Sequence, residues 1–179
     1  MVHNSPAGSV SPGHELSSGS GVDAASFREL MSAFPSGVAV VTTLDLDGSP
    51  RGLTCTSLCS VSASPPMLLV CVHRGSGSLA AVRRRGAFAV NLLHSEGRAA
   101  AEAFAHPDGW RFEGTPWEGT AGRSLPRLTK HAHATAECAV VRTFDAGDHT
   151  VVLGQVEEIQ MDGRPPLMYG LRHYAAWTG

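Results

Sequence analysis

The stretch from Thr54 to Val72 reads TCTSLCSVSASPPMLLVCV. Six of the eleven residues from Thr54 to Ser64 carry a hydroxyl group, and an uncharged apolar run follows the pair Pro65-Pro66. The prolines fix φ and favour an extended entry into this run, so residues 67–72 are predicted to form a buried strand. A hydroxyl run held extended offers small donors and acceptors on an uncharged surface, which suits a flat, heteroatom-rich ring. The alternative is a Ser/Thr-rich hairpin arm of an all-β domain.

Upstream of this stretch, the pattern predicts a short helix followed by a β-hairpin. Asp23 is suited to cap the helix, whose apolar residues recur at i, i+3, i+4 and i+7 as Phe27, Leu30, Met31 and Phe34. A β-branched strand is expected over 38–44, with a turn at Asp47-Gly48 and a return strand beginning near Arg51.

Downstream, short strands continue to alternate with a few helices. Periodicity predicts helices over 79–85 and 95–105, strands over 87–93, 136–143 and 150–159, and a loop over 107–130. Seven or so closely spaced strands indicate a mainly β fold, a barrel with helical decoration. Residues 23–179 are predicted to form one domain. Residues 1–22 are predicted to be a disordered tail, because twelve of them are Ser, Gly or Pro.

Composition limits the classes of protein that this chain can represent. The 179 residues are 42% hydrophobic and 17% charged, with a net charge of -2, which argues against a nucleic-acid-binding surface. No apolar run approaches the ~20 residues of a membrane span, and the N-terminus lacks the pattern of a signal peptide. The four cysteines have neither zinc-finger spacing nor the density of a disulfide framework. We therefore expect a reduced, cytoplasmic protein with no membrane or nucleic-acid partner.

The turn at Ser76-Gly77-Ser78 is a candidate anion site. It places two hydroxyls and free backbone N–H groups at a predicted helix start, where the helix dipole favours a phosphate. The alternative is a helix N-cap with a flexible approach.

Histidines form the other candidates. His149 lies in a tight loop between two predicted strands, and either positions a ligand at a pocket mouth or is a solvent-exposed turn residue. His131 and His133 would share one face of a strand, but they lack a third ligand of matching spacing, so no metal site is predicted. The chain also lacks a dinucleotide-binding glycine motif, a nucleophile elbow and a zinc-protease motif. If the protein is an enzyme, the difficult chemistry belongs to a bound cofactor.

Taken in order, several short motifs match a known family. They are FPSGVAVVTT at 34–43, the Asp47-Gly48 turn, GLT at 52–54 with Ser57, SVS at 60–62 before Pro65-Pro66, FAVNLL at 88–93, Phe104, Glu137-Cys138, GDH at 147–149 and GQV at 154–156. The chain resembles, over about residues 27–177, the small flavin reductases that serve two-component flavin-dependent monooxygenases.

This resemblance implies a mainly β, FMN-binding type of split β-barrel with a few short helices, and a homodimer with flavin sites near the subunit interface. Two segments would border the isoalloxazine ring, namely Ser36, Gly37 and Val38, and Thr54, Cys55, Thr56, Ser57, Leu58 and Ser60. Ser76 and Ser78 would hold the ribityl phosphate, and Asn91 would lie beside the flavin. His149 would contact the nicotinamide nucleotide as the catalytic-site histidine, with Tyr174 as a C-terminal aromatic residue nearby.

Two departures from the family pattern stand out. Cys55 and Cys59 occupy positions where other small or apolar residues are more usual. The phosphate turn contains Gly77 in place of a basic residue, so Arg74 or an arginine from 83–85 is expected to compensate.

The activity that the resemblance implies is an NAD(P)H:flavin oxidoreductase. Hydride would pass from NADH or NADPH to FAD or FMN, and the reduced flavin would serve a separate flavin-dependent monooxygenase. No adenine-binding motif decides between FAD and FMN. Two other functions fit the same fold, a non-catalytic flavin-binding sensor or store and a split-barrel flavin oxidase acting on another organic substrate.

Overall fold

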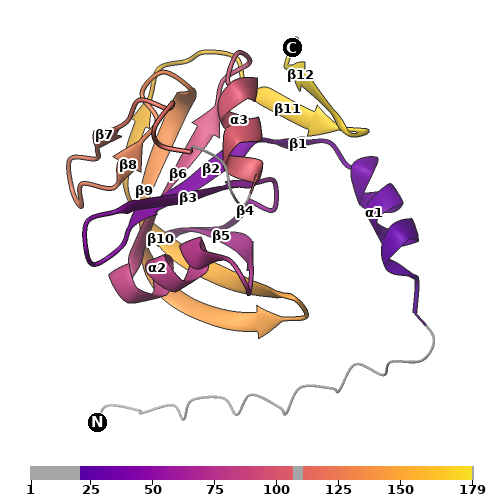
Figure 1. Ribbon diagram of the computed structural model, residues 1–179, viewed down its shortest axis with the longest axis horizontal. Coiled ribbons are helices and arrows are strands. Elements are labelled where there is room, and N and C mark those ends of the chain that lie inside the picture. Colours follow the sequence, from indigo (N-terminus) through magenta and orange to yellow (C-terminus); the bar gives the residue numbers. More distant parts are fainter. Residues whose placement is uncertain (1–20, 107–110, 179) are drawn as a thin grey trace.

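The computed structural model describes residues 21–106 and 111–178. Most of the predicted tail over 1–22 therefore lies outside the described residues. Within the two described ranges the chain forms short helices and many strands, as the sequence predicts (Figure 1). The helices are α1 (Ala24–Ser32), α2 (Gly77–Arg85) and α3 (Arg98–Ala105). The strands are β1 (Ser36–Gly37), β2 (Ala39–Leu44), β3 (Pro50–Cys55), β4 (Cys59–Ala63), β5 (Pro66–His73), β6 (Ala87–Leu93), β7 (Glu118–Gly119), β8 (Pro126–Arg127), β9 (Ala132–Ala146), β10 (His149–Met161), β11 (Leu167–Gly170) and β12 (His173–Ala176).

Seven of these strands form one antiparallel sheet in the order β3-β2-β6-β9-β10-β5-β4. The two edge strands, β3 and β4, are consecutive in the chain and are separated only by residues 56–58. Because the four steps from Cys55 to Cys59 span roughly 14 Å at most, the end of β3 lies close to the start of β4, so the sheet is rolled into a barrel. Among the described residues no ladder of hydrogen bonds joins β3 to β4, which leaves the barrel split at this seam.

Strand β2 is buried on both faces because it separates two apolar clusters. Ala39 and Val41 point into the barrel interior with Phe88, whereas Val40 packs on the other side with Phe104 of α3. This double burial explains why residues 38–41, VAVV, read as a continuous apolar run rather than an alternating one. The outer cluster is closed by α3 and by the three-stranded sheet β1-β11-β12.

The helix predicted after Asp23 forms, but its apolar face stays uncovered. The Asp23 side chain accepts hydrogen bonds from the N–H groups of Ala25 and Ser26 at 2.8 and 3.0 Å, as expected of an N-cap. Leu30 nevertheless remains 68% exposed, and no residue of α1 is buried. Figure 1 shows α1 standing beside the barrel rather than on it. Amphipathic spacing therefore predicts the helix correctly, but none of the residues in 21–106 and 111–178 buries its apolar face.

A few predicted boundaries shift. The helix expected from Ser95 begins at Arg98, and the long β9–β10 hairpin extends beyond both of its predicted strands. The predicted loop over 107–130, where described, contains the two-residue strands β7 and β8. His131 lies in the turn before β9, so only His133 of this pair is in a strand.

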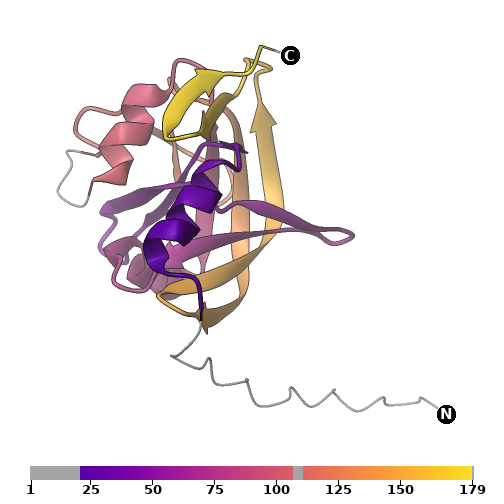
Figure 2. The same ribbon diagram turned by 90° about the vertical axis from the view of Figure 1, so that its right-hand side faces the viewer.

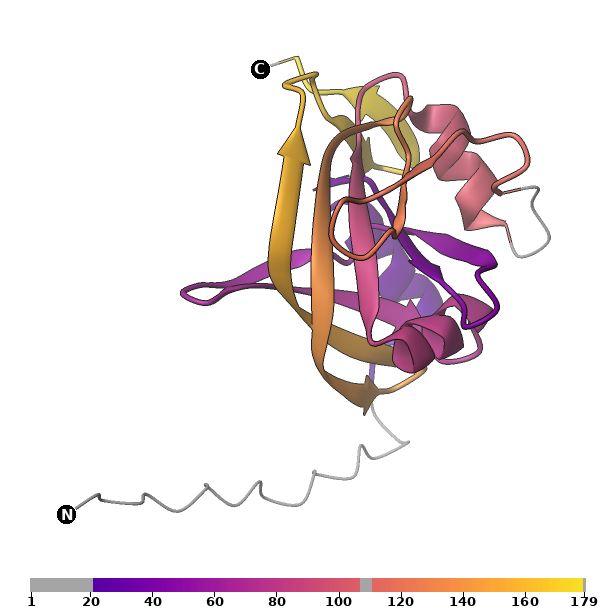
Figure 3. The same ribbon diagram turned by 90° about the vertical axis from the view of Figure 1, so that its left-hand side faces the viewer.

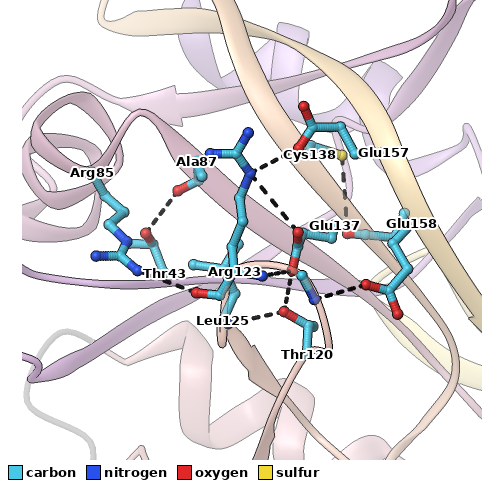
Figure 4. A network of polar contacts seen from close by, with 12 residues as sticks. Thr43, Arg85, Ala87, Thr120, Arg123, Leu125, Glu137, Cys138, Glu157 and Glu158 are labelled. Carbon is cyan, nitrogen blue, oxygen red and sulfur yellow. Dashed lines mark hydrogen bonds and ion pairs between the residues drawn. The ribbon is translucent and has the colours of Figure 1, made fainter.

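The segment between α3 and β9 is held by a polar network around Glu137 (Figure 4). The Glu137 carboxylate, 3% exposed, accepts hydrogen bonds from the Thr120 hydroxyl and from the Arg123 backbone N–H. The Arg123 side chain in turn donates to Glu157 at 2.8 Å. These contacts fasten the β7–β8 segment to β9 and β10. Arg111 lies upstream of that segment, between α3 and β7.

Candidate functional site

Two cavities flank the hydroxyl-rich segment at the barrel seam. The first, which we call the helix-side cavity, has a volume of 660 Å³ and lies between α1, β1, residues 56–59 and the β11–β12 turn. The second, the turn cavity, has a volume of 490 Å³ and lies between β3, α3 and the turn that opens α2. Most of the residues predicted to bind flavin line one of these cavities or a smaller hollow beside them.

The turn cavity brings together the residues predicted to hold the phosphate. Ser76, Gly77 and Ser78 line it together with Thr54. Ser76 caps α2, and its hydroxyl oxygen accepts a hydrogen bond from the Ser78 N–H at 3.3 Å. Because the first N–H groups of a helix have no intrahelical partner, the turn can present the Gly77 N–H to the cavity, whereas the Ser76 and Ser78 N–H groups donate to the His73 carbonyl and to the Ser76 hydroxyl. The N-cap geometry and a phosphate site are therefore compatible in one turn.

The two serines of this turn differ in what their hydroxyls contact. The Ser78 hydroxyl is buried and donates to the Gly52 carbonyl at 3.1 Å, which fixes the turn to β3. The Ser76 hydroxyl is only partly buried at the cavity wall. Of the two side chains, Ser76 is thus the better placed to contact a bound anion.

The arginines that line the turn cavity are Arg51 and Arg111, not those expected from the sequence. Arg111 is held in place by hydrogen bonds from Nη1 to the Gly52 carbonyl at 2.7 Å and from Nε to the His106 carbonyl at 3.1 Å. Two guanidinium groups beside a helix N-terminus create a positive potential suited to a phosphate.

The arginines expected from the sequence have other partners in this structure. Arg74 and Arg83 contact Asp145 at 3.6 and 3.1 Å, and Arg84 contacts Asp45 at 2.7 Å. Arg85 donates to the Arg123 carbonyl at 3.2 Å. Arg74 lies in the turn before α2, and the other three form the last turn of that helix; all four contact acidic or carbonyl partners, and none lines the cavity.

The hydroxyl run forms the wall between the two cavities, but several of its hydroxyls are engaged with the backbone. Thr54 donates to the Ala101 carbonyl of α3 at 2.6 Å. Ser57 donates to the Cys71 carbonyl at 3.1 Å and accepts from the Cys71 N–H at 3.2 Å, which fastens the seam to β5. Thr56 and Leu58 line the helix-side cavity with Ser57. The hydroxyls of Thr54 and Ser57 thus hold the segment to α3 and β5, and residues 56–58 face the helix-side cavity.

The Ser36–Val38 segment meets the hydroxyl run in a hollow of 120 Å³. Ser36, Gly37 and Val38 line this hollow together with Thr56 and Leu58. The two segments predicted to border the same ring are therefore adjacent in space. Ser60 lies on exposed β4 and lines neither cavity, whereas Cys55 is buried in the barrel core, where burial raises the pKa of its thiol.

His149 contacts a second histidine, His73, which lines the turn cavity. It begins β10 directly opposite His73 of β5, and the two imidazole rings meet edge to face with centroids 5.5 Å apart. His73 lines the turn cavity. On its other side, His149 Nδ1 lies 2.7 Å from the Asp148 carboxylate, and this hydrogen bond lowers the pKa of Asp148. Since an ionised carboxylate only accepts, Nδ1 carries the proton.

Asn91 and Tyr174 lie outside both cavity linings. Asn91 is 0% exposed, and its amide contacts Val40, Thr42, Pro126, Leu128 and Thr135 through hydrogen bonds. Tyr174 packs on Tyr169, with ring centroids 4.9 Å apart, and Tyr169 lines the helix-side cavity. Burial raises the pKa of the Tyr174 hydroxyl.

Sequence reasoning missed three residues of the turn cavity, Arg51, His73 and Arg111. A signal for Arg51 exists, because it alternates with Leu53 along β3 and both line the cavity. Arg111 lies in a segment whose sequence shows neither helical nor strand periodicity, so no local pattern indicates its position. It is fixed there by its neighbour Phe112, whose ring packs on that of Phe104 with centroids 4.9 Å apart.

The described residues contain neither a metal-binding cluster nor a membrane-spanning helix. No group of three or more His, Cys, Asp or Glu residues is arranged to hold a metal ion. None of the described helices has the length and apolar character that crossing a bilayer requires.

Comparison with known proteins identifies the family. The model of the flavin reductase like domain matches residues 31–178, and the chain belongs to this family. A flavin reductase (NADPH) of Lentzea aerocolonigenes is 50% identical over 160 residues, covering 89% of this chain and 94% of the relative. A flavin reductase (NADH) of Kitasatospora aureofaciens is 46% identical over 160 residues, covering 87% of this chain and 83% of the relative.

A solved structure confirms the fold. BorF, the flavin reductase component of a bacterial two-component tryptophan halogenase, superimposes with a TM-score of 0.77 at 30% identity, covering 86% of this chain and 98% of that one. The mainly β, split-barrel fold predicted from the motifs is thereby confirmed, and so is the predicted family.

Proposed function

We propose that this protein is an NAD(P)H-dependent flavin reductase that releases reduced flavin to a separate flavin-dependent monooxygenase. The oxidoreductase activity and its flavin and nicotinamide substrates agree with the relatives described above. The observation that carries the assignment within this chain is the turn cavity, where a helix N-terminus and two arginines adjoin the hydroxyl-rich seam. That arrangement fits a ligand with an anionic end and a flat, uncharged ring.

The residues present fit a flavin whose phosphate lies in the turn cavity and whose ring lies beyond the seam. Ser76, Gly77, Arg51 and Arg111 would hold the phosphate in the turn cavity. Thr56, Leu58 and the Ser36–Val38 segment would border the ring on the other side of the seam. The chemistry that flavin supplies is acceptance of a hydride from the nicotinamide. The chain itself therefore contributes binding and orientation rather than an acid or a base.

A direct assay tests the activity. Protein is mixed with free FMN, FAD or riboflavin and with NADH or NADPH, and absorbance at the nicotinamide band is followed with and without each flavin. We expect flavin-dependent oxidation of at least one nucleotide. Flavin binding without nucleotide oxidation would support a sensor or store and contradict the reductase. Oxidation of an organic compound without nicotinamide would support the oxidase.

The phosphate assignment makes a further prediction. Ser76→Ala should weaken FMN binding about fivefold, since one hydrogen bond contributes ~1 kcal/mol, and should leave riboflavin binding nearly unchanged. Fluorescence titration with each flavin measures both affinities. Ser78→Ala is the matched control, because the Ser78 hydroxyl already donates to the Gly52 carbonyl. Its loss should lower the free energy of unfolding without changing the ratio of FMN affinity to riboflavin affinity. Equal losses of FMN and riboflavin affinity in Ser76→Ala would contradict a phosphate site.

We also propose that the protein is a homodimer. The apolar face of α1 is exposed at Phe27, Leu30, Met31 and Phe34. The β4–β5 hairpin projects from the barrel (Figures 2 and 3). The exposed apolar face of α1 favours association with another subunit. Sedimentation should therefore give twice the 18.7 kDa of the chain.

A pair of variants tests where the subunits meet. Leu30→Asp should shift the protein toward monomer, because a charge would be buried in the interface. Leu46→Asp, at a residue of similar exposure in the β2–β3 turn, should leave the dimer intact. A wild-type monomer would contradict the dimer, and a dimeric Leu30→Asp variant would place the interface elsewhere.

A cytoplasmic location completes the proposal. All four cysteines are unpaired, which is usual for proteins of reducing compartments.

A further inference from the structure

His73 occupies the position between the phosphate turn and His149. Its ring lines the turn cavity, and its Nδ1 accepts a hydrogen bond from the Gly75 backbone N–H at 3.1 Å. The same ring meets His149 edge to face at 5.5 Å. One side chain thus contacts both the turn expected to hold flavin phosphate and the residue expected to contact the nicotinamide nucleotide.

The contact between His73 and the turn is close. A Cβ atom added at Gly75 would lie 3.2 Å from Cε1 and 3.3 Å from Nδ1 of His73, so the imidazole packs directly against the turn backbone. The turn is also fixed by the Ser76 N–H, which donates to the His73 carbonyl at 2.9 Å. The ring orientation of His73 therefore depends on the conformation of residues 73–76.

The orientation of His149 is restrained from two sides. Asp148 binds Nδ1, and the His73 ring packs against the imidazole. The Arg74 N–H donates to the Asp148 carbonyl at 3.0 Å, so the two loops are also joined through their backbones. Both imidazoles are partly exposed, and neither is held by the barrel core. A change in the turn can therefore alter how His149 is presented.

We propose that His73 is a positioning residue that couples the two nucleotide sites, so that flavin phosphate and nicotinamide nucleotide strengthen each other's binding. This inference rests on the proposed function, which assigns one ligand to the turn cavity and the other to His149. A phosphate bound by Ser76 and the Gly77 N–H stabilises the turn in the conformation that aims the Gly75 N–H at His73. The oriented His73 ring then holds His149. Because such coupling is thermodynamic, the effect is reciprocal.

The experiment compares FMN with riboflavin, which differ by the phosphate. Affinity for NAD⁺ or NADP⁺, according to which nucleotide is used in turnover, is measured by calorimetry on protein saturated with either flavin. We expect wild-type protein to bind the nucleotide about fivefold more tightly with FMN than with riboflavin, at the low end of measured couplings.

Two substitutions separate the two contacts of His73. His73→Phe keeps a ring against His149 but removes the acceptor for Gly75, whereas His73→Asn keeps an acceptor but removes the ring. Both should bring the FMN-to-riboflavin ratio close to one, while riboflavin affinity shows that the site is still folded. Arg74→Ala is the matched control. Arg74 is adjacent, its side chain faces Asp145 and it does not line the cavity, so the ratio should stay at the wild-type value.

The measurements distinguish a failure of the coupling from a failure of the proposed function. A wild-type ratio of one, in a protein that reduces flavin, would overturn the coupling and leave the proposed function intact. A wild-type ratio retained in either His73 variant would show that His73 does not connect the sites. If wild-type protein bound neither flavin nor nucleotide, the proposed function would be overturned together with this inference.

Discussion

A His149→Ala variant is expected to lose one to two decades of kcat/KM for the nicotinamide nucleotide while its flavin affinity stays near wild type. The loss of one hydrogen bond or close contact to the nucleotide corresponds to ~1–3 kcal/mol. Because hydride transfer takes no proton from this residue, the loss should appear mainly as a higher KM. Steady-state kinetics at saturating flavin give both constants, and fluorescence titration gives the flavin affinity.

The neighbouring carboxylate supplies a graded control for this prediction. Asp148→Asn keeps an oxygen that accepts from His149 Nδ1 but removes the charge, so its effect should be smaller than that of His149→Ala. A His149→Ala variant that lost flavin affinity and kept its KM for the nucleotide would reverse the assignment of the two ligands. Kinetics identical to wild type would make His149 a turn residue without a ligand.

An Asn91→Ala variant should lower the free energy of unfolding by about 3–4 kcal/mol, because several buried groups would lose their partner at once. The Leu128 N–H, at 2.9 Å from Asn91 Oδ1, would be left without that acceptor in a fully buried place. Denaturant unfolding measures the change. Thr135→Val removes only one contact to the same oxygen and should cost about 1 kcal/mol.

Asn91 also separates a structural contribution from a ligand contact. The family resemblance places it beside the flavin, whereas its amide here is buried and bonded to β2, β8 and β9. If Asn91→Ala kept full stability but lost flavin affinity, a direct flavin contact would be established and the packing interpretation would be contradicted. Reduced stability with nearly normal flavin affinity in the folded fraction would support a structural contribution.

The strands of the barrel could be predicted because their signals are local. The Asp47-Gly48 turn, the proline pair before β5 and the β-branched run of β2 each specify a conformation over a few residues. The Ser76–Ser78 turn and the helix that it opens were likewise predictable, and phosphate binding there stays a prediction. The charges around that turn were not, because Arg111 reaches the cavity through a loop whose position depends on Phe112 packing against α3.

The hydroxyl run shows a different limit of prediction. Its composition indicated a polar surface for a ring, and its position beside two cavities agrees with that expectation. Composition could not show that Thr54 and Ser57 donate to backbone carbonyls from distant parts of the chain. Similarly, the helix after Asp23 was predictable from spacing, but spacing does not say whether this chain or a second one covers its apolar face.

The double burial of β2 has a consequence for how the sheet finds its alignment. In a strand with one solvent-exposed face, burial of the apolar side chains fixes the register, since a shift of one residue would expose them to solvent. In β2 such a slip would only exchange one apolar cluster for the other. The distinction must come from polar side chains that have a single suitable partner. Thr42 donates to the Pro126 carbonyl, Thr43 to the Ala87 carbonyl and Asn91 to the Val40 carbonyl. These buried polar groups therefore fix the register of β2. Their removal should allow a shifted register as well as lower the stability of the sheet.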